Sequence, residues 1–340
     1  MSATRPAGSL DVVLLLDDPT GLTSTDSTET FLFVDEAVVA IEAALTALGH
    51  RPRRLSFELG VSAVIEFLTA QRPDVVVVLG QPVPDDPDGE SQVVALLDLL
   101  RIPHTSESVD ALALVRDKPR VKMVAAHHGL SVPAYAVCHN GVLPEQLPPA
   151  PWIVKPALEH GSRGIECATP ATDRADLAAR VQALRARFRQ PVLVDTFIDG
   201  REFQVGIVGD DLLPVLELDF SALPPEAPKM IGYATKWHYE SVEFKSLHYS
   251  CPARIDERTA LALTDLARGA VDAFGLRRCS RLDIRMDAGG ALYLLDVNPN
   301  PDLSPIATMH AMAEASGRSF TWMVERLLQL ALQERRKEPR

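Results

Sequence analysis

The sequence has few cysteines, and they stand far apart. The four thiols among the 340 residues are Cys138, Cys167, Cys251 and Cys279. None has a partner at the close spacing of a zinc knuckle or a redox pair. Isolated thiols in a chain of this size are typical of a reducing compartment. The cysteine pattern therefore excludes a cysteine-based zinc or redox site and favours a cytoplasmic protein.

Long apolar runs and positive charge are also scarce. No stretch reaches the ~18 uninterrupted apolar residues of a membrane span, and residues 1–10 lack the apolar run of a signal peptide. The 34 Lys and Arg stand against 46 Asp and Glu, a formal net charge of −12. Such a surface repels a phosphate backbone, although a local basic cluster can still bind a small anion. We expect no membrane and no nucleic-acid partner.

The chain is too long for one core of ordinary size, so we expect several domains around a shared cleft. In its first third, short apolar segments alternate with segments of helical periodicity, which predicts a parallel, doubly wound α/β sheet. Later segments are richer in hairpins, so the fold class is α/β with α+β parts. The predicted domains are 1–107, 108–194 and 195–340, the last with a covering loop at about 221–250.

A polar pattern marks the last expected hairpin. Arg281 and Asp283 share one face of its first strand, and Asp296 and Asn298 share one face of its second. Two carboxylates and an amide oxygen on rigid strands suit Mg²⁺, which prefers oxygen ligands. The guanidinium beside them can hold an oxyanion. An ordinary solvated face with charge pairs is the alternative interpretation.

The register of this hairpin depends on its turn. If Met286 pairs with Ala291 across the turn, Arg281 faces Asp296, and the four polar side chains lie on the same side. The same alternation places Leu282 in the core.

Two lysines indicate a phosphate site. Lys155 ends an apolar strand just before the glycine-containing turn 160–164, and Lys118 lies in a basic cluster within the segment 109–129, which has helical periodicity. Glycine lets backbone N–H groups approach phosphate oxygens. The chain has no Walker-type glycine loop. Each lysine alone also fits a solvated surface position.

The segment from Asp195 to Glu202 follows an expected strand and contains an Asp-Gly turn. Such a strand end offers backbone donors and acceptors to an adenine edge, and Glu202 could reach a ribose hydroxyl. Because Asp-Gly turns between strands are frequent, the pattern alone is weak.

Taken together and in order, these segments resemble the D-alanine–D-alanine ligase branch of the ATP-grasp superfamily. The resemblance covers about residues 10–330. The segments that carry it are ALLDLLRIPHTSES, DKPRVKMVAAHHGLSVPAY, PWIVKPALEHGSRGI, VLVDTFIDGREFQVGIV, GYATKWHYES and RLDIRMDAGGALYLLDVNPNPDLSP.

The resemblance implies an ATP-grasp fold of three domains with ATP between the middle and last. It implies Mg²⁺ as cofactor, with Mn²⁺ possible, small carboxylate and amine substrates, and a homodimer. The implied roles are phosphate binding for Lys118 and Lys155, a lid contact to the phosphates for Lys236, the adenine hinge for Asp195 and Ile198, ribose binding for Glu202, metal binding for Asp283, Asp296 and Asn298, and oxyanion stabilisation for Arg281. Ser162 matches one of the two serines in the family's middle-domain turn.

Several positions depart from the family pattern. Asp296 stands where a glutamate is usual, and Gly161 where a second serine is usual. No Glu-Val-Ser segment, which holds the donor's ammonium in the family, occurs in 23–31. The usual Pro-Gly-Met run is replaced in 301–303, and the serine that holds the acceptor carboxylate falls at Ala307. These departures predict an unchanged ATP site and rebuilt amino-acid pockets.

The predicted function is therefore an ATP- and Mg²⁺-dependent carboxylate–amine ligase that forms an amide through an acyl-phosphate and releases ADP and phosphate. We expect amino acids or small peptides other than two D-alanines as substrates. The alternatives are a genuine D-alanine–D-alanine ligase, an ATP-grasp enzyme with a hydroxyl, thiol or intramolecular acceptor, and a nucleotide-binding regulatory protein without activity.

Overall fold

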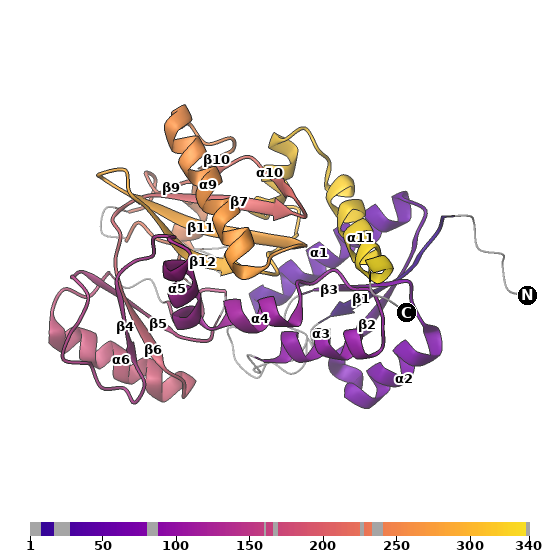
Figure 1. Cartoon of the computed structure of the whole chain (residues 1–340), viewed down its shortest axis with the longest axis horizontal. Coiled ribbons are helices and arrows are strands. Elements are labelled where there is room, and N and C mark those ends of the chain that lie inside the picture. The colour runs from indigo at the N-terminus through magenta and orange to yellow at the C-terminus, as the bar shows by residue number, and fades with distance from the viewer. Residues whose placement is uncertain are drawn as a thin grey trace, which may run out of the picture.

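Three sheets organise the part of the chain that the structure describes (Figure 1). The computed structural model describes residues 8–16, 28–79, 88–159, 161–165, 169–224, 228–232 and 241–337. No helix in these ranges is long and apolar enough to cross a membrane.

The first sheet is parallel, with strand order β2-β1-β3. Its elements are β1 (Asp11–Leu16), α1 (Thr28–Ala47), β2 (Arg51–Ser56), the 3-10 helix η1 (Phe57–Leu59), α2 (Val61–Gln71), β3 (Val75–Val78) and α3 (Gly89–Leu99). The expected parallel α/β arrangement is confirmed here. The sequence did not predict β2, because its arginines and Pro52 hide a strand that lies at the sheet edge and buries only Leu55.

The second sheet is antiparallel, in the order β4-β6-β5. Its elements are β4 (Tyr135–Cys138), β5 (Trp152–Pro156), α6 (Arg174–Phe188) and β6 (Val192–Thr196). Two helices precede it, α4 (Val109–Arg116) and α5 (Lys118–His127), where the sequence predicted one helical segment. That prediction was wrong because the backbone of Asp117 is extended, which ends α4. The Asp117 side chain then caps α5 by accepting a hydrogen bond from Arg120 N, and Pro119 stands in the first turn of that helix.

The third sheet has the order β10-β9-β7-β11-β12, and β8 pairs with β7. Its elements are β7 (Gly200–Val208), β8 (Asp211–Leu212), β9 (Leu216–Asp219), α8 (Val242–Lys245), β10 (His248–Ser250), α9 (Glu257–Phe274), β11 (Cys279–Asp287), β12 (Leu292–Asn298), α10 (Thr308–Ala315) and α11 (Phe320–Lys337). Within the expected covering loop, α8 precedes β10, and β10 extends the sheet by pairing with β9.

The register of the last hairpin differs from the expected one. Met286 pairs with Leu292, and Arg281 faces Asn298 instead of Asp296. The register shifts between Asp283 and Ile284. Counting residue pairs outward from the turn assumes a regular ladder, so it could not predict this irregularity. The polar side chains still share one face.

The two faces of the third sheet serve different purposes. Alternate residues of β7, β11 and β12 enter a core beneath α9, and Leu282 is fully buried there, as predicted. The opposite face carries the polar residues. A second core joins the first sheet to the last helices, and α11 packs against α1 and β3 (Figure 1). The domain boundaries themselves stay a prediction.

Glu107 anchors the start of the middle region to β11. Its buried carboxylate accepts hydrogen bonds from Arg277 N at 2.7 Å, Arg278 N at 2.9 Å and Ser280 Oγ at 2.8 Å. Burial raises the pKa of Glu107, and these donors oppose that rise. The contact fixes the strand that carries the polar face relative to the first sheet.

Candidate active site

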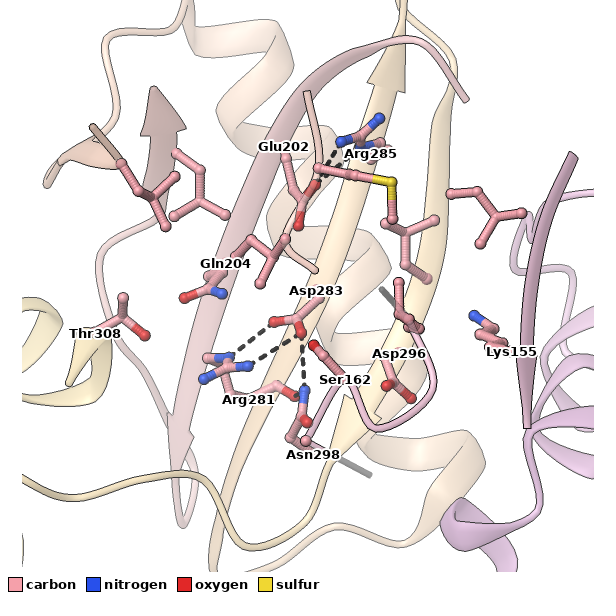
Figure 2. A pocket seen from close by; sticks show the side chains of 18 of the residues that line it. Lys155, Ser162, Glu202, Gln204, Arg281, Asp283, Arg285, Asp296, Asn298 and Thr308 are labelled. Atoms are coloured by element: carbon pink, nitrogen blue, oxygen red, sulfur yellow. Dashed lines mark hydrogen bonds and ion pairs between the residues drawn. The ribbon is translucent and has the colours of Figure 1, made fainter. Parts of the chain in front are cut away.

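A cavity of about 580 Å³ lies between the middle sheet and the polar face of the third sheet. It is covered by residues of the 221–250 segment, among them Met230, Phe244 and Tyr249. The predicted site residues that line it are Lys155, Ser162, Asp195, Ile198, Glu202, Arg281, Asp283, Asp296 and Asn298. Figure 2 shows the polar side chains converging from β7, β11 and β12, with Lys155 on the far side.

The four hairpin residues form one connected group. Asp283 lies opposite Asp296, and Arg281 lies opposite Asn298. Arg281 Nε donates to Asp283 Oδ1 at 2.8 Å and its Nη2 to Oδ2 at 3.1 Å, while Asn298 Nδ2 donates to Asp283 Oδ2 at 3.0 Å (Figure 2). Burial opposes the charge on Arg281, but the carboxylates of Asp283, Asp302 and Asp296 together raise its pKa. The guanidinium is therefore a fixed positive charge.

The donor set fits a magnesium ion. The two carboxylates that face each other across the strands, with the Asn298 amide oxygen, supply hard oxygen ligands on one side only. No group of three His, Cys, Asp or Glu side chains suited to a metal occurs among the described residues. Mg²⁺ does not need one, because it usually keeps several water or phosphate ligands.

Lys118 joins the site from the start of α5. Its Nζ lies 2.8 Å from both carboxylate oxygens of Asp296, and its side chain is almost fully buried. The structure therefore brings Lys118 to the metal-binding candidates rather than to open solvent.

Asp195 holds two lysines. Lys155 Nζ lies 3.0 Å from Asp195 Oδ2, and Lys122 Nζ lies 3.2 Å from Oδ1. Burial opposes the charge on Lys155, but Asp195 and Asp296 raise its pKa overall. Burial lowers the pKa of Lys122 to about 8. Sequence reasoning gave Lys122 no role, although it stands one helical turn after Lys118 and so shares its face.

Glu202 is paired with a residue that the sequence analysis missed. Arg285 Nε donates to Glu202 Oε2 at 2.9 Å, Nη1 donates to the Ile198 carbonyl at 2.6 Å, and Nη2 donates to the Lys229 carbonyl. The guanidinium also lies 5.0 Å from the Phe197 ring centroid. The alternation along β11 that identified Arg281 and Asp283 continues to Arg285, so the sequence pattern could have identified Arg285 as well.

The turn after β5 places Ser162 in the cavity wall, with a positive φ of 63° (Figure 2). Gly164 has a φ of 78°, and a Cβ there would lie 2.7 Å from Pro156 Cγ, so glycine is required. Lys236, the expected lid lysine, lies outside the described residues.

Comparisons with known proteins identify the family. The family model of the D-ala D-ala ligase C-terminus matches residues 144–329. The D-alanine–D-alanine ligase of Gluconobacter oxydans is 30% identical over 302 residues, covering 86% of this chain and 94% of the relative. That of Rhizobium meliloti is 32% identical over 292 residues, covering 83% and 89%. The crystal structure of the Bacillus anthracis ligase complexed with ATP superposes with a TM-score of 0.72 at 15% identity, covering 97% of this chain and 100% of that one.

Fold, site and relatives together define an ATP-grasp enzyme, an ADP-forming carboxylate–amine ligase that depends on ATP and Mg²⁺. The chain belongs to the D-alanine–D-alanine ligase family, as the resemblance predicted. Its substrates are small molecules. The homodimer, the cytoplasmic location and the individual residue roles stay predictions.

Proposed function

We propose that this protein joins two D-alanine molecules, with cleavage of ATP to ADP and phosphate. The observation that carries the proposal is the match to D-alanine–D-alanine ligases along most of both chains, 86% of this one and 94% of the Gluconobacter oxydans enzyme. The preferred prediction from sequence, substrates other than two D-alanines, finds no support in these comparisons. They favour the alternative, a genuine D-alanine–D-alanine ligase.

The first step is attack by the carboxylate of one D-alanine on the γ-phosphorus of ATP, which breaks the bond to ADP and forms an acyl-phosphate. Lys155, which lines the cavity, and Lys118, which is buried against Asp296, balance the negative charge of the phosphates. Glu202 accepts from the ribose hydroxyls, and the backbone near Ile198 contacts the adenine. Mg²⁺, when bound to Asp283, Asp296 and Asn298, neutralises charge on the transferring group.

The second step is attack by the amine of the other D-alanine on the acyl carbon. The tetrahedral intermediate carries an oxyanion, which the Arg281 guanidinium stabilises because Asp283 holds its orientation through two hydrogen bonds. Phosphate leaves, the amine loses a proton, and a peptide bond remains. The covering segment, including Met230 and Phe244, excludes water that would hydrolyse the acyl-phosphate.

The test is incubation of the purified protein with ATP, Mg²⁺ and D-alanine, followed by mass spectrometry for the dipeptide and chromatography of the nucleotides. We expect D-alanyl-D-alanine and ADP in equal amounts, with kcat/KM at or above about 10⁴ M⁻¹s⁻¹. L-Alanine is the matched control substrate. Absence of the dipeptide, while another amino-acid pair stimulates ADP release, would restore the prediction of rebuilt pockets.

A further inference from the structure

Gln204 presents an unused polar atom to the cavity. It lies on β7 between Glu202 and Gly206, on the same face as both, and only 2% of it is exposed. Its Oε1 is buried and accepts no hydrogen bond from the residues that the structure describes. Figure 2 shows the side chain in the cavity beside Asp283, its neighbour across the strands. A buried acceptor of this kind costs free energy unless a ligand satisfies it.

Gly206 brings a helix end close to Gln204. A Cβ at position 206 would lie 3.0 Å from Met309 Sδ and 3.0 Å from Met312 Cε, so α10 packs directly on the bare backbone of β7. The strand register also places Gly206 beside Arg281. Because glycine has no side chain, the start of α10 can lie at the edge of the polar face.

Thr308, the first residue of α10, presents a second unused atom. Its Oγ1 is buried and has no hydrogen-bond partner in the described parts of the chain, and the residue lines the cavity. Ala307, which precedes it as N-cap, offers no side-chain hydrogen bond to the helix. The first turn of a helix attracts negative charge through its N–H groups.

The positions of Gln204 and Thr308 indicate which of the two substrate amino acids, donor or acceptor, they contact. Gln204 and Thr308 lie on one side of the Arg281–Asp283 pair, whereas Asp296 and Lys155 lie on the other (Figure 2). The phosphates belong with the lysine, so the donor carboxylate must lie between the two sides. The amino acid that attacks then approaches from the side of Gln204.

We propose that Gln204 and Thr308 bind the acceptor amino acid, an inference that rests on the proposed function. Gln204 Oε1 accepts a hydrogen bond from the acceptor's amine and orients it toward the acyl carbon. Thr308 Oγ1 and the first turn of α10 donate to its carboxylate. Thr308 thereby supplies, one position later, the hydroxyl that Ala307 lacks relative to the family pattern.

The experiment compares Gln204→Leu and Thr308→Val with the wild type. The rate of ADP release is measured against D-alanine concentration and fitted with separate donor and acceptor constants. We expect each variant to raise the acceptor constant about tenfold or more, with the donor constant and the KM for ATP unchanged. Thr308→Ser keeps the hydroxyl and retains acceptor affinity. Thr264→Val, the same change on α9 beneath the sheet, is the matched control.

Thermal unfolding separates a binding role from a structural one. Because Gln204→Leu removes an unsatisfied buried group, its Tm without substrates should equal or exceed that of the wild type. If the wild type makes the dipeptide and both variants keep the wild-type acceptor constant, the inference fails and the proposed function stands. If the wild type makes no dipeptide, both fail together.

Discussion

Lys118 Nζ lies 2.8 Å from each carboxylate oxygen of Asp296, although the two residues are 178 positions apart in the chain. The contact joins the first turn of α5 to β12. It places an ammonium against a carboxylate that is also a candidate metal ligand. We propose that binding of ATP with Mg²⁺ redistributes this pair, with the lysine passing to phosphate oxygens and the carboxylate to the metal.

Replacement of Lys118 by methionine should reduce kcat/KM for ATP by about a hundredfold or more, because a buried positive charge that faces the phosphates is lost. The rate of ADP release at varied ATP measures the effect. Arg120→Met is the control, since its exposed guanidinium pairs with Asp117 and lies away from the cavity lining. Equal losses in the two variants would show that general charge on α5, and not this contact, matters.

The strand alternation of β11 predicts opposite consequences for adjacent residues. Asp283→Asn, on the cavity face, should lower turnover by roughly a hundredfold or more while the protein still folds. Asp296→Asn should behave in the same way. Leu282→Asn, on the fully buried face, should destabilise the fold by about 2–4 kcal/mol. Denaturant unfolding and ADP release measured on the same samples test this, and the reverse pattern would contradict the assignment of faces.

Arg285→Met should weaken ATP binding and stability together. The substitution leaves Glu202 buried without its partner, a change that typically costs about 3–5 kcal/mol, and releases the Ile198 and Lys229 carbonyls. The double variant with Glu202→Gln should recover part of the stability but not the KM for ATP. Calorimetry and nucleotide kinetics separate these two effects.

The stability of the single variant Arg285→Met should also depend on pH. Burial already raises the pKa of Glu202, with Arg285 opposing the rise. Without the guanidinium, Glu202 in the folded state binds its proton still more tightly than in the wild type, and more tightly than in the unfolded state. The Arg285→Met protein should then lose stability as pH rises above the ordinary glutamate pKa of 4.5, whereas the wild type should depend less on pH in this range. Tm measured from acidic to neutral pH checks the direction.

Local pattern was sufficient to predict much of the site. Alternation along β11 and β12 places Arg281, Asp283, Asp296 and Asn298 on one face under either register, which is why an incorrect register left the cluster intact. The pairing of Arg281 with Asn298 depends on a register shift between the strands, and no turn rule fixes that from sequence.

What the sequence could not predict are contacts between distant elements. The Lys118–Asp296 pair and the packing of α10 on Gly206 depend on how whole sheets and helices meet. Gln204 was missed because a single amide on a strand carries no spacing signal. Only the structure shows that the Gln204 side-chain oxygen is buried without a hydrogen-bond donor among the described residues. The strand β2 was missed because an edge position tolerates charged residues.

Lys122 should make the stability of the fold depend on pH above neutrality. Burial lowers its pKa from 10.5 to about 8, and the nearby Asp195 carboxylate only partly compensates. Between these two values the unfolded chain holds a proton that the folded protein has released, so stability contributed by this group rises with pH in that window. Below pH 8 both states are protonated and the penalty of a buried charge is present in full.

In Lys122→Met this dependence is absent. The difference in unfolding free energy between wild type and variant should therefore shift in favour of the wild type from pH 8 to pH 10.5. Denaturant unfolding of both proteins across the range measures the difference directly, and it cancels the titration of other lysines and tyrosines. A difference that stays constant over that range would mean that Lys122 keeps an ordinary pKa in the fold.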